Sequence, residues 1–183
     1  MKRGKKAQVW IETVLYTVIG LVILGLVLAF AQPKIAEIKD RTVIEQTLET
    51  LNQLDNQIME VKINGPGNIR TPELKITRGE LLIDGVNDQI IFKIKDSRVI
   101  YSEPGKKIKF GSIEILSETS VENAKRADIS LILDYSPKNI NLKYGGAEES
   151  KTFQPVSTFY KISIENLGAD DNLITEINMK EIS

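Results

Sequence analysis

The side chains of this chain that could take part in chemistry are mainly acidic and basic ones, because none of the 183 residues is Cys or His. Without them the chain has no thiolate nucleophile, no Ser–His triad, no disulfide and none of the usual zinc or iron ligand sets. The Asp and Glu residues alternate with Lys in predicted strands or lie in turns. Asp170-Asp171-Asn172 offers oxygen ligands, yet it lacks the spacing of an EF-hand calcium loop. We therefore predict no enzyme, no catalytic residue, no cofactor and no metal site.

One carboxylate, that of Glu12, lies where an acid is costly. It stands at the start of an apolar run, residues 13–33, that contains no Asp, Glu, Lys or Arg. As a helix this run would be about 30 Å long, which is enough to cross a membrane. An acid at bilayer depth costs roughly 2.5 to 3.5 kcal/mol. The position of Glu12 therefore indicates a function beyond anchoring.

Four basic residues precede the apolar run and set its orientation: Lys2, Arg3, Lys5 and Lys6. The positive-inside rule leaves them in the cytoplasm and sends everything after Pro33 outward. We therefore expect a protein in the cell membrane, with a cytoplasmic N-terminus and residues 34–183 outside.

The residues around Glu12 resemble the archaeal type IV pilin-like proteins with class III signal peptides. The resemblance lies in Lys5-Lys6-Ala7-Gln8-Val9-Trp10-Ile11-Glu12 and covers about the first 33 residues. In that family a prepilin peptidase removes a short basic leader on the cytoplasmic side. Gly or Ala precedes the cut, Gln follows it, and Glu is the fifth mature residue. By this pattern residues 1–7 are a cleaved leader and the cut falls between Ala7 and Gln8. Trp10 departs from the pattern, since a small polar residue is common there.

The resemblance also implies a role for Glu12 in assembly. In such filaments the acid compensates the new terminal amine of a helix, in its own subunit or in a neighbour. A paired buried charge costs much less than an unpaired one, so Glu12 would set the register between staggered subunits. The implied function is that of a structural subunit in a type IV pilus-like surface filament, used for adhesion or motility. Its partners would be copies of itself or other pilins, and it would lie in the membrane before assembly and in an extracellular filament afterwards.

Three other interpretations of the N-terminus stay open. In the first, Glu12 lies in the headgroup region beside Lys5 and Lys6, where an acid costs little. In the second, a secretory signal is cleaved after Ala29-Phe30-Ala31, although the run is longer than a usual signal core. In the third, an uncleaved single-pass membrane protein displays a β-sandwich as a binding or filament-stator module. The N-terminal residue of the protein recovered from cells distinguishes a retained leader, a cut at Gln8 and a start near Gln32.

The element that must position Glu12 is one long helix, predicted over residues 8–61. Its first part, 8–33, is the membrane or filament-core segment. Its second part, 34–61, is amphipathic, with an apolar stripe at steps of three and four residues and charged residues between. The helix ends at Asn64-Gly65-Pro66-Gly67-Asn68, because two glycines and a proline in five residues cannot continue it. The stripe is made of Ile35, Ile38, Ile44, Leu48, Leu51, Leu54 and Ile58.

Residues 62–183 have the pattern of an extracellular β-rich domain. Short runs rich in β-branched and aromatic residues alternate with turn signals. About ten such runs favour an antiparallel sandwich. The predicted fold class is thus α+β, a long N-terminal helix followed by an antiparallel β-sandwich-like domain, with residues 145–151 as a loop. The predicted strands are residues 74–76, 81–83, 89–94, 99–101, 107–110, 113–115, 129–135, 140–144, 159–164 and 173–179.

The charge balance argues against one class of partner. Removing the four basic residues of the leader from the 24 in the chain leaves 20 against 25 acidic residues, a side-chain balance of −5. An acidic domain of this kind is soluble and binds nucleic acid poorly. We therefore predict no nucleic-acid partner.

Overall fold

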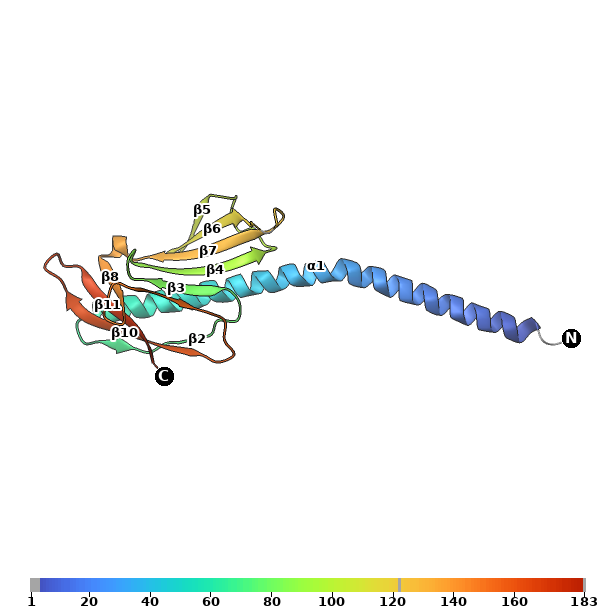
Figure 1. Ribbon diagram of the computed structural model, residues 1–183, viewed down its shortest axis with the longest axis horizontal. Coiled ribbons are helices and arrows are strands. Elements are labelled where there is room, and N and C mark those ends of the chain that lie inside the picture. Colours follow the sequence, from blue (N-terminus) through green and yellow to red (C-terminus); the bar gives the residue numbers. More distant parts are fainter. Residues whose placement is uncertain (1–3, 122, 183) are drawn as a thin grey trace. The chain divides into compact units, whose positions relative to one another are not determined.

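The computed structural model describes residues 4–121 and 123–182, with side chains from residue 9 onward. A helix, α1 (Gly4–Ile63), precedes all the strands. The chain forms two compact units, Met1–Lys39 and Asp40–Ser183, so α1 belongs to both. Figure 1 labels the elements along the chain.

The first unit consists of the N-terminal part of α1. The helix continues through Pro33 without a break, although proline lacks the amide hydrogen that would bond to the carbonyl four residues earlier. The large apolar side chains from Val9 to Ile38 are 45% to 78% exposed. The prediction of a long N-terminal helix is confirmed.

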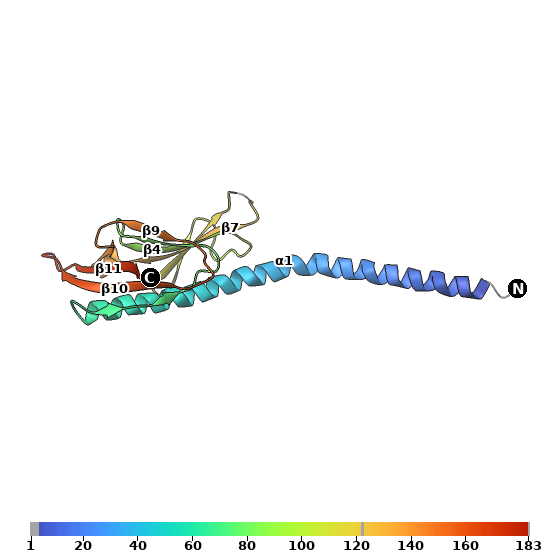
Figure 2. The ribbon, with the colours of Figure 1, turned by 60° about the horizontal axis from the view of Figure 1, so that its bottom comes forward.

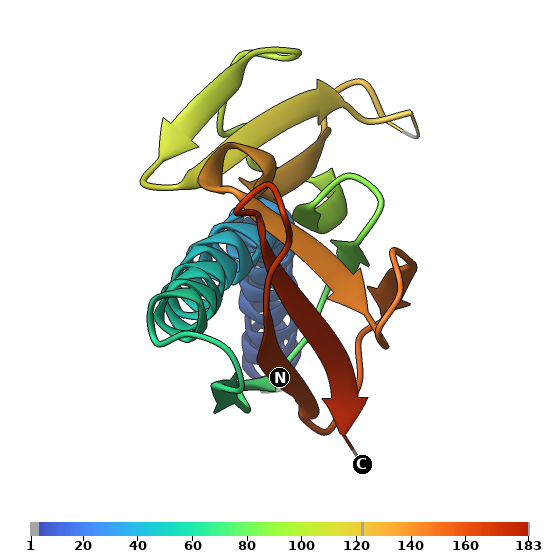
Figure 3. The ribbon, with the colours of Figure 1, turned by 90° about the vertical axis from the view of Figure 1, so that its left-hand side faces the viewer.

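The rest of α1, from Asp40 to Ile63, belongs to the core of the second unit. Figure 3 looks along this part of the helix and shows strands on several sides of it. Its buried apolar side chains recur at steps of three and four residues and are at most 5% exposed. The prediction was wrong for Ile35 and Ile38, which lie in the first unit and are 51% and 63% exposed. The buried apolar residues are Ile44, Leu48, Leu51, Leu54, Ile58 and Val61.

The helix ends two residues beyond its predicted end, at the turn that the sequence indicates. Gly65 and Gly67 adopt left-handed conformations, with φ of 84° and 80°, which glycine reaches without the steric cost of a side chain. The amide of Asn64 still donates to the carbonyl of Glu60 at 2.9 Å, and no helical residue follows Ile63 until the short 3-10 helix η1 (Ser136–Lys138) in the described part of the chain.

The strands of the second unit form two sheets. The first sheet has the order β1-β10-β11-β8, with β2 also paired to β10, and the second has the order β5-β6-β7-β4-β3-β9. The strands of the first sheet are β1 (Ile69–Arg70), β2 (Glu73–Leu74), β8 (Ile140–Tyr144), β10 (Tyr160–Ala169) and β11 (Thr175–Ile182). Those of the second are β3 (Glu80–Asp84), β4 (Gln89–Ser97), β5 (Lys107–Phe110), β6 (Ile113–Thr119), β7 (Ala127–Asp134) and β9 (Ser150–Phe153).

Pairing within the sheets is antiparallel except between β8 and β11, which are parallel. Along β7, buried and half-buried residues alternate strictly, as expected of a strand with one face on the core. Figure 2 shows β10 beside the last turns of α1. The predicted α+β class, with a helix followed by two packed and largely antiparallel sheets, is confirmed.

One predicted strand, residues 99–101, does not form. The pairing of β4 with β7 becomes irregular between Ile94 and Ser97, and Asp96 has a left-handed φ of 55°. After this bulge the chain leaves the sheet, and the amides of Tyr101 and Ser102 donate to the hydroxyl of Ser117 instead of to a strand, at 3.3 and 3.1 Å. A side chain thus replaces the partner strand.

The predicted loop over residues 145–151 is too long at its end, because Ser150 and Lys151 lie in β9. This strand pairs with β3 and ends at Phe153, which is 2% exposed. The ring of Phe153 contacts those of Tyr144 and Tyr160 edge-on, with centroids 6.1 and 5.0 Å apart. The buried aromatic contact holds β9 in place.

Candidate functional site

Between Thr13 and Pro33 the surface of α1 carries no charged residue on any side. No residue is buried in the 18-residue window that makes the helix long and apolar enough to cross a membrane. A helix that is hydrophobic all round needs apolar surroundings. By length and composition the helix could therefore cross a membrane. The large exposed side chains of the run are Val9, Trp10, Ile11, Val14, Leu15, Tyr16, Val18, Ile19, Leu21, Val22, Ile23, Leu24, Leu26, Val27, Leu28 and Phe30.

The two threonine hydroxyls of this segment bond within the helix. Thr13 Oγ1 donates to the carbonyl of Val9 at 2.9 Å, and Thr17 Oγ1 donates to the carbonyl of Thr13 at 2.8 Å. Such a bond to the preceding helical turn satisfies a hydroxyl that hydrocarbon cannot solvate. Both threonines are therefore compatible with an apolar environment.

Glu12 brings a formal charge to the same helix. Its side chain lies on the exposed surface of α1, and that of Tyr16, one turn further, is 71% exposed. Between Val9 and Pro33 the sequence holds no Lys or Arg. The Glu12 carboxylate thus lies on the same exposed helix surface as the apolar side chains of the run. Its predicted role in register stays a prediction.

Ala7 and Gln8, the residues of the predicted cut, lie in the helical backbone of α1, but their side chains are outside the described residues. Residues 1–3 of the predicted leader are outside them altogether. Because Gln8 precedes Glu12 by four residues, a new amine at Gln8 would lie on the same face, about 6 Å away along the helix axis.

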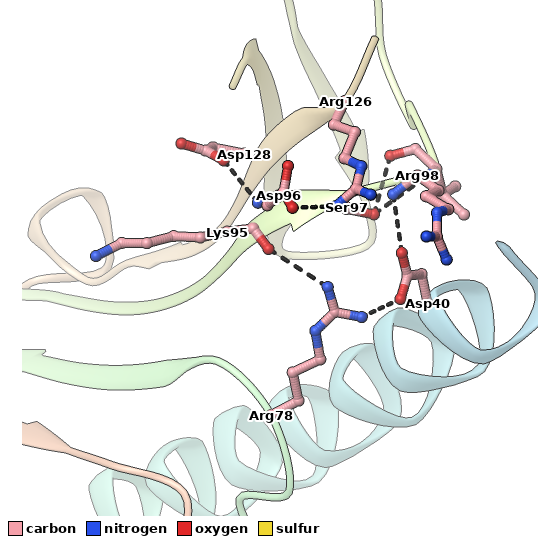
Figure 4. Close-up of polar contacts among 9 residues, drawn as sticks. Asp40, Arg78, Lys95, Asp96, Ser97, Arg98, Arg126 and Asp128 are labelled. Atoms are coloured by element: carbon pink, nitrogen blue, oxygen red, sulfur yellow. Dashed lines mark hydrogen bonds and ion pairs between the residues drawn. The ribbon is translucent and has the colours of Figure 1, made fainter. Parts of the chain in front are cut away.

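In the second unit the buried carboxylate of Asp40 anchors the beginning of the α1 segment that belongs to this unit. Asp40 is 5% exposed. One of its oxygens accepts a hydrogen bond from the guanidinium of Arg78, and the other accepts the amide of Arg98 at 2.8 Å (Figure 4). Arg78 also donates to the carbonyl of Lys95 at 3.4 Å. A buried charge is tolerated when it is paired in this way, so Asp40 fixes α1 to the ends of β3 and β4.

A second pair of charges lies at the same end of β4. The carboxylate of Asp96, in the bulge of β4, accepts a hydrogen bond from Arg126, which precedes β7. The amide of Asp96 donates to the carboxylate of Asp128 at 2.8 Å, as Figure 4 shows. These contacts hold the left-handed backbone of Asp96 and so the point where the chain leaves the sheet.

Further along α1, Asp55 joins the helix to the turn between β5 and β6 and to the 3-10 helix η1. It is 7% exposed and accepts hydrogen bonds from the Ser112 hydroxyl at 2.6 Å and from Lys138 Nζ at 2.7 Å. Lys138 Nζ also lies 4.8 Å from the centre of the Tyr135 ring. Burial, with the nearby charge of Asp55, raises the pKa of Tyr135 well above its usual value. The tyrosine therefore stays neutral.

The last carbonyls of α1 are satisfied by a side chain from β10. Asn166, 2% exposed, donates from its amide nitrogen to the carbonyls of Val61 and Lys62 at 3.0 and 3.3 Å. Its side-chain oxygen accepts the amide of Gly168 at 2.8 Å. The terminal carbonyls of a helix need such partners, so Asn166 links the helix end to the first sheet.

These polar groups hold elements of the second unit in position through bonds to side chains and to backbone groups. Asp170, in the turn between β10 and β11, accepts the amides of Asn172 and Ile174 at 2.9 and 2.8 Å. The bond from Ile174 is the main cause that lowers the pKa of Asp170. Among the described residues there is no group of three or more Asp and Glu that could hold a metal ion. The turn interpretation of Asp170-Asp171-Asn172 agrees with this geometry.

The structural roles of Asp40, Asp55 and Asn166 were not predicted from the sequence. A signal existed for Asp55, because it lies four residues after Leu51 and three before Ile58, directly in the apolar stripe. An acid at such a position indicates a buried partner. Asn166 gives no comparable signal, since its role depends on a helix end more than a hundred residues earlier.

Comparison of the chain with models of protein families, with curated proteins and with solved structures finds no match to any of them. The N-terminal residues and the helix that displays them are therefore the features of this chain that bear on its function.

Proposed function

We propose that the protein is a structural subunit of a type IV pilus-like surface filament, assembled through its N-terminal helix. The observation that carries the proposal is an exposed helical segment, residues 13–33, that holds no charged residue and follows one acid, Glu12, and a basic leader. The leader residues match the class III signal pattern, with Ala7 before the cut, Gln8 after it and Glu12 as the fifth mature residue. Prepilin peptidase would be the processing partner.

The apolar helix supports assembly as well as membrane insertion. In the membrane the uncharged residues 13–33 span the hydrocarbon, which is about 30 Å thick. Outside the membrane the same surface must be covered by other apolar surfaces. Copies of this helix, or the helices of other pilins, provide such surfaces, and their heterologous contacts lead to an open helical filament.

Glu12 is the residue that gives this assembly a register. A cut before Gln8 creates a terminal amine one helical turn from the Glu12 carboxylate, in the same chain or in a neighbour. In apolar surroundings a paired carboxylate is much cheaper than an unpaired one. Where the amine comes from a neighbour, only subunits staggered so that each acid meets an amine avoid that cost.

The acidic, β-rich second unit would then be displayed on the outside of the filament, where it serves adhesion or motility. Its core includes α1 residues from Ile44 onward, so the displayed domain is held by the helix that assembles. The subunit would lie in the cell membrane before assembly and at the cell surface afterwards, with no nucleic-acid partner.

The test is replacement of Glu12 by Ala, with Gln32→Ala as a matched polar control at the other end of the run. Glu12→Ala should insert into the membrane normally and accumulate there, while surface filaments are lost. Gln32→Ala should assemble like the unmodified protein. Abolished insertion in Glu12→Ala, or filaments in normal amount, would contradict the register role.

A further inference from the structure

A cavity of about 580 Å³ lies between α1 and the chain that connects β2 to β3. Its volume is in the range of roughly 300 to 1,000 Å³ that is usual for binding pockets. All the residues that line it belong to the second unit. Much of its wall is apolar, so it offers space for apolar groups of a bound molecule. The apolar residues of the wall that are at most 6% exposed are Leu51, Leu54, Leu74, Ile76, Leu81 and Phe92.

The chain that borders this cavity continues an edge of the first sheet beyond β2. Exposed and buried residues alternate over residues 71–77, as in an extended strand. The carbonyls of Pro72 and Ile76 accept amides of β10 and of the segment that precedes it, each at 3.1 Å. Successive residues of a strand direct their backbone groups to opposite sides. The backbone groups of Lys75 and Thr77 therefore point away from β10, towards the open side of this edge.

The amides and carbonyls on this open side are unpaired. Among the residues that the structure describes, none forms a hydrogen bond with the backbone of Lys75 or Thr77. Both residues are exposed, and both line the cavity. An edge with free amides and carbonyls can pair with a further strand, and main-chain bonds of this kind are a recurring way of binding extended peptides. The molecule thus presents half of a β ladder beside an apolar cavity.

From the unpaired edge and the cavity beside it we infer that residues 73–77 bind an extended peptide segment of another protein as an added strand. Side chains of such a strand alternate between the two faces of the sheet. The residue opposite Lys75 lies on the exposed face. The residues before and after it lie on the other face, next to Leu74 and Ile76, whose side chains are buried and line the cavity. These two peptide residues should therefore be apolar.

The charge of Lys75 determines which residue the peptide should carry opposite it. Lys75 Nζ lies 5.4 Å from the centre of the Phe159 ring, and no carboxylate in the described part of the chain pairs with it. Opposite charges that face each other across two strands stabilise the pair, and like charges destabilise it. The peptide that fits this edge therefore has an acidic residue between two apolar ones.

The test is nuclear magnetic resonance of the full-length protein in mild detergent, titrated with a synthetic peptide. The probe is a heptapeptide with blocked ends, in which glycine and serine flank a central isoleucine, glutamate and isoleucine. The amide signals of Lys75 and Thr77 should shift and exchange more slowly, with a Kd below about 1 mM. Thr77→Pro removes one amide of the edge and should weaken binding by about threefold to tenfold. Thr77→Ala, the matched control, keeps that amide and should bind like the unmodified protein.

A charge exchange at Lys75 gives a second test that does not depend on the proline variant. Lys75→Glu should weaken binding of the glutamate peptide by about twofold to fivefold and should prefer a peptide with lysine in its place. Equal preference in both proteins would refute the pairing with Lys75.

Three further results would overturn the inference. The first is no binding of the peptide at about 1 mM. The second is a shift of the Leu74 and Ile76 side-chain signals without any change at the amides of Lys75 and Thr77, which would assign the cavity to a small apolar ligand. The third is a dimer of the protein without peptide that Thr77→Pro abolishes, which would assign the edge to a second copy. All these measurements give the same answer whether or not the leader is cut, so they leave the proposed function untouched.

Discussion

Replacing Ile58 by Ala should strongly destabilise the second unit, because this side chain of α1 is 0% exposed in its core. Losing three buried methyl or methylene groups costs about 2.4 kcal/mol at about 0.8 kcal/mol each. The cavity left behind brings the total to about 4 kcal/mol. For a unit of 144 residues, Asp40–Ser183, each kcal/mol lowers the Tm by about 3 to 4 °C, so we expect a fall of about 12 to 16 °C.

The matched control for Ile58→Ala is Ile63→Ala, the same substitution five residues later on the same helix. Ile63 is 78% exposed, and its truncation should change the free energy of unfolding by less than about 0.5 kcal/mol. The assay is thermal unfolding of the full-length protein in mild detergent, followed by near-ultraviolet circular dichroism of the tyrosines. Four of the five, Tyr101, Tyr135, Tyr144 and Tyr160, lie in the second unit. Equal Tm values for the two variants would refute the claim that α1 forms part of the core.

Three further substitutions probe the polar contacts. Arg78→Met leaves the buried Asp40 without its guanidinium and should lower the free energy of unfolding by about 2 to 3 kcal/mol, which urea unfolding measures. The loss is smaller than for a fully buried pair because Arg78 is 38% exposed. An Asp40→Leu/Arg78→Met double variant should recover the lost stability. Asn166→Ala removes the partners of two helix carbonyls and should cost about 1 to 3 kcal/mol, with faster amide exchange in the last turn of α1; unchanged exchange would show that the cap is dispensable. Burial raises the pKa of Asp84, but hydrogen bonds from Asn87, Ser150 and two amides outweigh it and lower the pKa. A lowered folded-state pKa gives stability that is present above about pH 4 and lost as the pH falls further. The difference in unfolding free energy between the protein and Asp84→Asn should therefore shrink below that pH. A constant difference would contradict the assignment.

The helix and most strands could be predicted because they follow from local pattern. An uncharged run, steps of three and four, and a turn with two glycines define α1, and alternation defines strands such as β7. The prediction of a strand at residues 99–101 was wrong because their composition is that of a strand, while the bulge at Asp96 directs the chain away from the sheet. The parallel pairing of β8 with β11 has no local signal at all.

The candidate site was predictable only in part, for the same reason. Glu12 is visible because one acid in an apolar run is a local anomaly. The roles of Asp40 and Asn166 depend on Arg78 and on the helix end, which are distant in sequence. The exposure of Ile35 and Ile38 also required the structure, since spacing alone placed them with the buried stripe.

The most direct test of the central claim is the N-terminal residue of the protein recovered from cell-surface filaments, determined by mass spectrometry of the intact chain. The proposed function predicts a chain that begins at Gln8 and lacks the mass of residues 1–7. An intact Met1, or a start near Gln32, would contradict it.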